Sequence, residues 1–269
     1  MKYVVITGVS GGMGFAAAKR LTEAGYYVFG LDIKEPKQEL ENFQFIKTDV
    51  REEGSVDRAL KKISKADIQL DAIISTAGIY EIGSLVEMDE EDFKTIFDIN
   101  IFGVYRVNKA FISLLREGGK VVMISSELAP LDPLPFTGIY AITKSTLEKY
   151  AFSLRMELQL LNKQVVVIRP GAIDTQFINN SNSKIKKFKE QTELYKKSAQ
   201  KFDDVVNSVE SRKVSPDKIG KLIYKIIEKE KPKYVYKINR NPLLLMMHCL
   251  PKRTQNKAIK NLLTKEKNA

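Results

Sequence analysis

A tyrosine and a lysine stand four residues apart at the start of a predicted helix, in the segment Tyr140-Ala141-Ile142-Thr143-Lys144. Side chains at this spacing share one helix face, so we expect the phenol and the ammonium to point the same way. A free tyrosine has a pKa of about 10 and is a poor base at neutral pH, but an adjacent ammonium stabilises the phenolate. Tyr140 would then exchange a proton with a substrate oxygen.

A glycine-rich segment, Thr7-Gly8-Val9-Ser10-Gly11-Gly12-Met13-Gly14, follows the first predicted strand and leads into a helix. Glycine permits a tight turn and the approach of a pyrophosphate to backbone amides, and the helix N-terminus adds unpaired N–H groups. Asp32 ends the second predicted strand, where an acid can bind ribose hydroxyls. Because its carboxylate would repel the 2′-phosphate of NADP, we expect NAD, with NADP as the alternative since Lys34 lies nearby.

The elements that must position these residues follow a regular alternation of apolar runs with longer stretches of helical periodicity. Strands are expected at 2–7, 27–32, 43–48, 70–75, 120–125, 164–169 and 233–236, and helices at 14–24, 53–65, 89–115, 140–161 and 216–228. The runs are continuous and β-branched, as in strands buried on both faces. The pattern predicts one α/β domain with a Rossmann-type doubly wound parallel sheet and a C-terminal helical extension.

The composition excludes several classes of protein. The 269 residues are 43% hydrophobic, and the single cysteine, Cys249, cannot form an internal disulfide. No Cys and His cluster has the spacing of a zinc site, so no metal is expected. No apolar run approaches the roughly 20 residues of a spanning helix, and we expect a cytoplasmic protein.

The net charge of +11 is unevenly distributed. Residues 1–175 carry a net charge of −3, and residues 176–269 carry +14. This excess favours a solvated lysine-rich surface, with attraction to anionic lipid as the alternative. Nucleic-acid binding is not expected, because no recognition motif accompanies the charge.

Taken together, these motifs resemble the short-chain dehydrogenase/reductase family, over residues 1 to about 240. The family has a Thr-Gly-x-x-x-Gly-x-Gly loop, an asparagine, a serine and a Tyr-x-x-x-Lys motif. The matching positions are Gly8, Gly12 and Gly14 in the loop, Asn100, Ser126, and the pair Tyr140 and Lys144. The resemblance implies an oxidoreductase that moves a hydride between NAD(H) and an alcohol or ketone.

The resemblance also implies a role for each catalytic residue. Tyr140 would be the acid or base, and Ser126 would polarise the reacting oxygen. Lys144 would lower the tyrosine pKa and bind the nicotinamide ribose, while Asn100 would link it to solvent through a water. Ser125 is the fallback for Ser126, although the alternation along a strand points it away from the site.

A wider set of cofactor contacts follows from the same resemblance. Asp49-Val50 would contact adenine, and Pro170-Gly171 with Thr175 would cover the nicotinamide. The full set is Gly8, Ser10, Gly12, Met13, Gly14, Asp32, Ile33, Asp49, Val50, Ala77, Gly78, Tyr140, Lys144, Pro170, Gly171, Ile173 and Thr175.

The chain departs from the family pattern at two places. Ser75-Thr76-Ala77-Gly78 stands where the family has Asn-Asn-Ala-Gly. Ser126 precedes Tyr140 by one residue more than usual, and we expect one inserted residue in the proline-rich loop 129–135.

The substrate end is expected in a lid at about 176–214, just after the nicotinamide segment. Its apolar positions, which would either cover a hydrophobic ligand or form ordinary core, are Ile185, Phe188, Tyr195, Ala199 and Phe202. Residues 241–269 form a basic amphipathic extension beyond the 1–240 domain. This layout is similar to the branch of 17β-hydroxysteroid and retinol dehydrogenases, which implies a lipophilic substrate; sugar alcohols and acyl-carrier-linked ketones are the alternatives.

The apolar run 243–250 and its basic flank predict either peripheral membrane contact or packing on the enzyme itself. By resemblance, a homodimer or homotetramer would form through the helices at 89–115 and 140–161. A non-catalytic redox sensor and a methyltransferase are the rival functions. Both are disfavoured because neither needs the proton relay of Tyr140 and Lys144.

Overall fold

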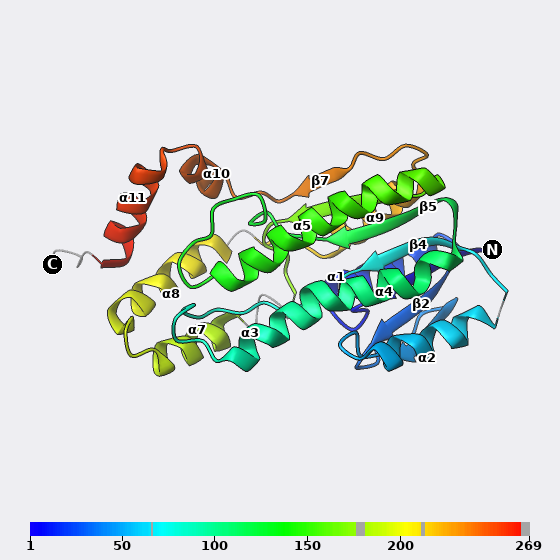
Figure 1. The fold of residues 1–269 in the computed structure, drawn as a ribbon, viewed down its shortest axis with the longest axis horizontal. Helices are drawn as coiled ribbons and strands as arrows, with labels where there is room; N and C mark the ends of the chain where they lie inside the picture. The colour runs from blue at the N-terminus through cyan, green and yellow to red at the C-terminus, as the bar shows by residue number, and fades with distance from the viewer. Residues whose placement is uncertain (66, 176–180, 211–212, 265–269) are drawn as a thin grey trace.

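A seven-stranded parallel sheet forms the centre of the molecule, and the computed structural model describes residues 1–65, 67–175, 181–210 and 213–264 (Figure 1). The strand order is β3-β2-β1-β4-β5-β6-β7. From β1 to β3 the strands are added on one side of β1, and from β4 to β7 they are added on its other side. In doubly wound sheets, the crevice at such a switch point, here between β1 and β4, binds ligands. The strands are β1 (Lys2–Thr7), β2 (Tyr26–Asp32), β3 (Phe43–Lys47), β4 (Leu70–Ser75), β5 (Leu115–Ile124), β6 (Gln164–Pro170) and β7 (Val235–Ile238).

Helices cover both faces of the sheet. One layer contains α1 (Gly12–Glu23) and α9 (Asp217–Glu228); the other contains α2 (Glu53–Ser64), α4 (Val104–Phe111) and α5 (Gly138–Leu158). Successive side chains of a strand point to opposite faces, so β1 places Val4 and Ile6 against the first layer and Val5 against the second. Both layers therefore need continuous apolar strands, which is the pattern in the sequence.

The expected sheet is confirmed, and the differences lie at element boundaries. The predicted helix at 89–115 is four pieces in sequence: α3 (Glu90–Phe97), a π-helical turn η1 (Asp98–Gly103), α4 and a short 3₁₀ turn η2 (Ile112–Leu114). β5 begins at Leu115, earlier than predicted, because Leu115 pairs with Leu70 before an irregularity in the register. Gly118, with φ of 70°, lies in that irregular stretch.

The lid and the extension gather at the carboxyl ends of the strands (Figure 1). They contain α7 (Ser181–Gln191), α8 (Lys196–Glu210), α10 (Pro242–His248) and α11 (Lys252–Thr264). The predicted apolar lid positions share one cluster with residues of the loop before α5 and of α11; its members include Ile185, Phe188, Ala199, Phe202, Phe136 and Leu263, with Tyr195 packed against them. Within the described ranges, no helix combines the length and apolar character needed to cross a bilayer.

Candidate active site

The glycine loop between β1 and α1 is pressed against the end of β4. Gly8 has φ of +74°, and a Cβ there would lie 2.6 Å from the Ala77 nitrogen. A Cβ on Gly14 would lie 2.1 Å from the Gly8 carbonyl oxygen, and one on Gly12 would lie 2.6 Å from Thr175 Cγ2. A side chain at Gly8 or Gly14 would displace backbone, and one at Gly12 would displace the Thr175 side chain, so the loop depends on glycine.

Hydroxyl groups join the ends of β1 and β4 where the family has asparagines. Thr76 Oγ1 donates to the Thr7 carbonyl oxygen at 2.6 Å, and the Ala77 N–H donates to Thr7 Oγ1 at 3.3 Å. Among the described residues, the buried Ser75 Oγ has no hydrogen-bond partner. Thr76 and Thr7 therefore fix the end of β1 and the start of the glycine loop against the end of β4.

A cleft of about 410 Å³ opens at the switch point, above the glycine loop. Its lining contains the predicted contacts Gly8, Ser10, Gly12, Met13, Gly14, Asp32, Ile33, Asp49, Val50, Ala77, Gly78 and Thr175. The Asp32 carboxylate accepts the Ser10 N–H at 3.0 Å and the Lys34 N–H at 3.2 Å, which fixes it at the cleft. Glycines at a helix N-terminus with an acid beyond them fit the pyrophosphate and ribose of a dinucleotide.

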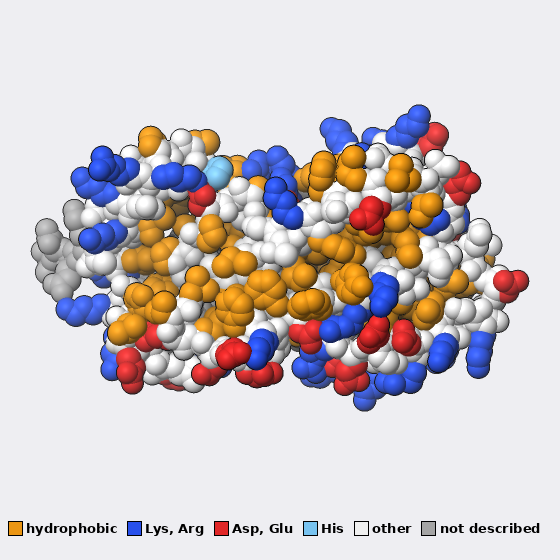
Figure 2. All heavy atoms as spheres, in the orientation of Figure 1, with side chains coloured by type: hydrophobic (Ala, Val, Ile, Leu, Met, Phe, Trp, Pro, Cys, Tyr) orange, Lys and Arg blue, Asp and Glu red, His pale blue; other side chains and the backbone are white. Residues whose placement is uncertain are grey.

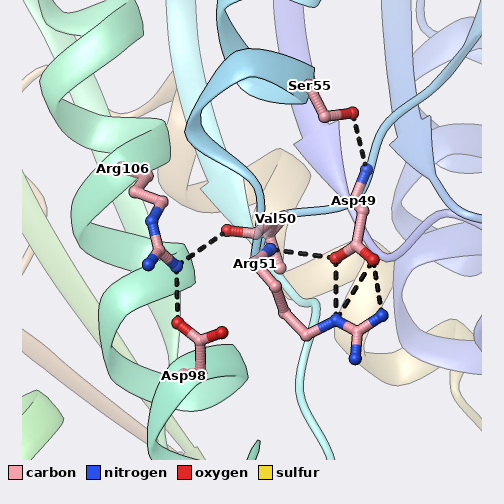
Figure 3. A network of polar contacts seen from close by, with 6 residues as sticks. All are labelled: Asp49, Val50, Arg51, Ser55, Asp98 and Arg106. Carbon is pink, nitrogen blue, oxygen red and sulfur yellow. Dashed lines mark hydrogen bonds and ion pairs between the residues drawn. The ribbon is translucent and has the colours of Figure 1, made fainter.

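A polar network borders the cleft at Asp49 and Val50, the predicted adenine contacts (Figure 3). Arg51 donates to Asp49 from its backbone at 2.9 Å and from Nη2 at 2.7 Å, and these bonds hold the pKa of the Asp49 carboxyl below its usual range. Arg106 Nη1 donates to Asp98 Oδ1 at 2.7 Å and to the Val50 carbonyl oxygen at 3.3 Å. The Asp49 side chain is thus engaged by Arg51, a residue that the sequence analysis did not single out although it lies two positions further along.

The predicted catalytic residues Ser126, Tyr140 and Lys144 meet in a second cavity. Tyr140 is buried, and the Tyr80 ring packs edge-on against it at 4.8 Å between centroids. Lys144 Nζ lies 5.7 Å from the Tyr140 ring centroid and donates to the Ile124 carbonyl oxygen at 3.0 Å. Tyrosine and lysine share one helix face, as their spacing predicts.

The electrostatics of this cluster differ from the expectation. Burial raises the pKa of Tyr140 above its ordinary value, and the hydrogen bond with Ser126 opposes that rise. Burial also lowers the pKa of Lys144 to about 8. The predicted lowering of the tyrosine pKa by Lys144 is therefore wrong for this arrangement, because desolvation outweighs an ammonium that is turned toward a backbone carbonyl.

Asn100 lies behind the site, fully buried in the π-helical turn. Its Oδ1 accepts the Ile79 N–H at 2.9 Å, and its Nδ2 donates to the Ile79 carbonyl oxygen at 3.0 Å and to Thr143 Oγ1 at 3.1 Å. A Cβ on Gly78 would lie 3.1 Å from that Oδ1 and 3.7 Å from Lys144 Nζ. Asn100 thus clamps the loop after β4 beside Lys144, and an extra π residue is a common way to aim such a side chain.

The second cavity, of about 170 Å³, adjoins the cleft through shared lining by Met13, Thr76, Gly78 and Thr175. Its other predicted contacts are Ser126, Tyr140, Lys144, Pro170, Gly171 and Ile173. Ser125, the fallback for Ser126, also lines this cavity, but its Oγ donates to Glu148 at 2.8 Å. Apolar side chains from the lid and the extension, Phe202, Val206 and Leu244, cover the cavity.

Leu244 and Glu127 are among the lining residues that the sequence did not predict. Leu244 comes from a tail whose packing could not be deduced from its composition. Glu127 directly follows Ser126, and an acid at the end of an apolar strand was an available signal.

A doubly wound sheet, a glycine loop at its switch point and a buried Ser126–Tyr140–Lys144 cluster define a class of dinucleotide-binding oxidoreductases. The sequence matches the family described as short chain dehydrogenase over residues 2–186. This chain belongs to that family.

Three relatives place the chain within the family. It is 29% identical to a 3-ketodihydrosphingosine reductase of Bacteroides thetaiotaomicron, covering 93% of this chain and 91% of the relative. It is 26% identical to an NADPH-dependent 3-dehydrocapnine reductase of Ornithobacterium rhinotracheale, covering 96% and 95%. Estradiol 17-beta-dehydrogenase 2 of Mus musculus is 30% identical over 74% of this chain and 55% of its own length, which agrees with the resemblance to the hydroxysteroid branch.

The fold has solved counterparts. A short chain dehydrogenase family protein from Francisella tularensis superposes with a TM-score of 0.72 at 23% identity, covering 88% of this chain and 96% of the other. This likeness establishes the Rossmann-type sheet independently of the motifs.

Proposed function

We propose that this chain catalyses the NADH-dependent reduction of a lipophilic ketone to an alcohol, and the reverse oxidation. The carrying observation is that an apolar cavity ends on Ser126, Tyr140 and Lys144 and adjoins the dinucleotide cleft. A non-catalytic redox sensor would need the cleft but not the buried cluster. The cluster therefore favours the enzyme.

The residues would divide the chemistry as follows. When bound, a reduced nicotinamide would supply the hydride for the carbonyl carbon. Tyr140, which is protonated at neutral pH, would donate its proton to the carbonyl oxygen, and Ser126 would hydrogen-bond the same oxygen. Lys144, whose Nζ donates to the Ile124 carbonyl oxygen, would bind the nicotinamide ribose, and Asn100 holds the neighbouring loop in place.

Two observations support the proposed substrate and the proposed cofactor. The names of the two relatives that match nearly the whole chain both describe reductases, and a ketone of the dihydrosphingosine kind suits a cavity covered by Phe202, Val206 and Leu244. Asp32 favours NADH, because a carboxylate at the ribose would repel a 2′-phosphate. The Ornithobacterium relative is NADPH-dependent, so both cofactors belong in the assay.

The test is the initial rate of NADH or NADPH oxidation with a panel of ketones. The panel runs from long-chain 3-ketones through a steroid and a retinoid to sugars and short ketones. We expect the highest kcat/KM with NADH and a long-chain ketone. A binding-only protein would retain NADH in equilibrium titrations without oxidising it in the presence of any ketone.

A homo-oligomer would form through the exposed faces of α4 and α5. Apolar side chains gather along the middle of the face where α4 and α5 lie (Figure 2). The exposed large hydrophobic residues of these helices and of the preceding turn η1 include Phe102, Tyr105, Phe152 and Met156. Such a patch on one face is suited to pairing with a second copy. Sedimentation velocity measures whether a dimer or a tetramer forms.

The extension would also bring a cytoplasmic enzyme to a membrane surface. Leu243 and Met246 of α10 are 54% and 63% exposed, and Lys252, Arg253 and Lys257 follow in α11. Apolar residues beside basic ones suit the interface of an anionic bilayer. Co-sedimentation with anionic vesicles at low salt, and release at high salt, is the expected behaviour. The competing role is packing on the enzyme, which Leu244 and the buried Leu263 also serve.

A further inference from the structure

The substrate cavity contains a carboxylate that the proposed reaction does not use. Glu127 directly follows Ser126, lines the same cavity and is 7% exposed. The charged side chains on the described lining are Glu127 and Lys144, and the rest of the wall is largely apolar. A buried carboxylate is costly unless a partner compensates it, so this position invites an explanation.

One of the two Glu127 carboxylate oxygens has a hydrogen-bond partner in the protein. Oε2 accepts the Asn241 N–H at 2.6 Å, at the residue that caps α10. Oε1 lies on the Gly171 side, where a Cβ on that glycine would be 2.9 Å away, and it has no hydrogen-bond partner among the described residues. Burial raises the pKa of the Glu127 carboxyl, while the Asn241 bond and the charge of Arg240 oppose the rise.

We propose that Glu127 is the recognition site for an ammonium group on the substrate, carried close to the carbonyl that Ser126 and Tyr140 bind. Glu127 directly follows Ser126 and lines the same cavity, so one ligand can place its carbonyl at Ser126 and a cation on a nearby carbon at Glu127. The apolar remainder of the cavity takes the hydrocarbon chain. The substrate class is then a long-chain amino ketone.

The negative charge of Glu127 distinguishes recognition of an ammonium group from the alternative role, in which Glu127 only anchors the C-terminal extension through the Asn241 N–H. An anchor for the Asn241 N–H requires one acceptor oxygen, which a glutamine would supply equally well. A substrate ammonium requires the negative charge, because charge-assisted hydrogen bonds are roughly twice as strong as neutral ones. Glu127→Gln therefore keeps the anchor and removes the recognition.

This inference rests on the proposed function, and the experiment separates the two. The kcat/KM for a long-chain 2-amino-3-ketone and for the matched ketones with hydroxyl or hydrogen at C2 are measured for wild type, Glu127→Gln and Asp132→Asn. Asp132 lies on the same loop outside this cavity, exposed and paired with Lys252 and His248. It controls for long-range attraction of a cation.

We expect wild type to prefer the amino ketone, and Glu127→Gln to reduce the ratio of amino to unsubstituted ketone by about 10-fold or more, as loss of a charged hydrogen bond does. Asp132→Asn should change that ratio less than about 2-fold. Equal preference for the hydroxy and amino ketones, or an equal loss in both variants, would overturn the ammonium site.

A calorimetric titration of a long-chain primary amine into the protein saturated with NADH provides the second measurement. Should no ketone be reduced, binding to wild type but not to Glu127→Gln would uphold the site while the proposed reaction fails. Absence of binding to wild type would overturn the site. The far-UV circular dichroism of both variants shows whether each is folded.

Discussion

The dinucleotide cleft and the substrate cavity share part of one wall but are built by different means. The cleft depends on backbone: Gly8, Gly12 and Gly14 occupy positions where a Cβ would meet other atoms within 2.6 Å. The cavity depends on side chains from distant segments, including Phe202 in the lid and Leu244 in the extension. A backbone requirement restricts a position to one residue type, whereas an apolar wall accepts several.

This contrast separates what a substitution should do in each region. Changes in the Ser126, Tyr140 and Lys144 cluster, which lines the substrate cavity, should abolish turnover. Changes in the cleft should alter cofactor choice, and changes in the cavity wall should alter the choice of ketone.

Tyr140→Phe should lower kcat for ketone reduction by about 10²- to 10⁴-fold, the usual contribution of a positioned acid. The ring remains, so its edge-on packing with Tyr80 and the affinity for NADH, measured by fluorescence titration, should change little. Since the tyrosine pKa is raised, the wild-type rate of alcohol oxidation should increase with pH.

The control is Tyr150→Phe on the same helix, where the hydroxyl accepts a bond from Asn108 at 3.2 Å away from the cavity. Full turnover by Tyr140→Phe would show that another group supplies the proton.

Lys144→Met should remove the part of the pH dependence of the free energy of unfolding that comes from the lowered pKa of Lys144. The lysine pKa is about 8 in the folded protein and about 10.4 in an unfolded chain. Between these values an unfolded Lys144 binds more protons than the folded one, so the contribution of Lys144 to the free energy of unfolding rises as the pH increases through this window. The difference corresponds to at most about 3 kcal/mol. Thermal unfolding at pH 7, 8.5 and 10 without cofactor measures it.

The variant should show a smaller rise in Tm than wild type across that range. Lys109→Met, whose exposed ammonium pairs with Glu53, serves as the control and should keep the wild-type slope. Equal slopes for all three proteins would mean that Lys144 is not desolvated in the free enzyme.

Asp32→Ala should reduce the preference for NADH over NADPH by about 10-fold, equivalent to about 1.4 kcal/mol. The change would remove both the proposed hydrogen bonds to the ribose and the charge that would repel a 2′-phosphate. Steady-state kinetics with each cofactor give the ratio of kcat/KM. Glu35→Ala, an exposed acid beyond the strand, should leave the ratio unchanged. If Asp32→Ala behaved like Glu35→Ala, the acid would have no role in cofactor choice.

Much of the cleft could be predicted from the sequence because its signals are local. A glycine loop after a strand and an acid at the end of the next strand fix both chemistry and position. The sheet followed from continuous apolar runs, which need burial on both faces. The π-helical turn around Asn100 was not predictable from periodicity, since it adds one residue to an otherwise regular amphipathic pattern.

The cavity was less predictable because its wall is assembled over long sequence distances. Tail residue Leu244 reaches the cavity, and Phe136, with φ of 66°, turns its ring into the lid cluster. The pKa of Tyr140 was also missed, because spacing places a lysine nearby but says nothing of how far both groups are removed from water. Tertiary burial decided each of these features.

Leu244→Ala tests the least predictable part of the wall and should have the smallest effect. Leu244 lines the cavity from α10, whereas its neighbour Leu243 is 54% exposed. Each buried methylene contributes about 0.8 kcal/mol, so loss of part of this contact should lower kcat/KM for a long-chain ketone by about 3- to 10-fold. The KM for NADH should not change, and Leu243→Ala should resemble wild type in both respects. A variant that affects NADH as strongly as the ketone would place α10 over the cleft rather than over the cavity, and the division between the two regions would have to be redrawn.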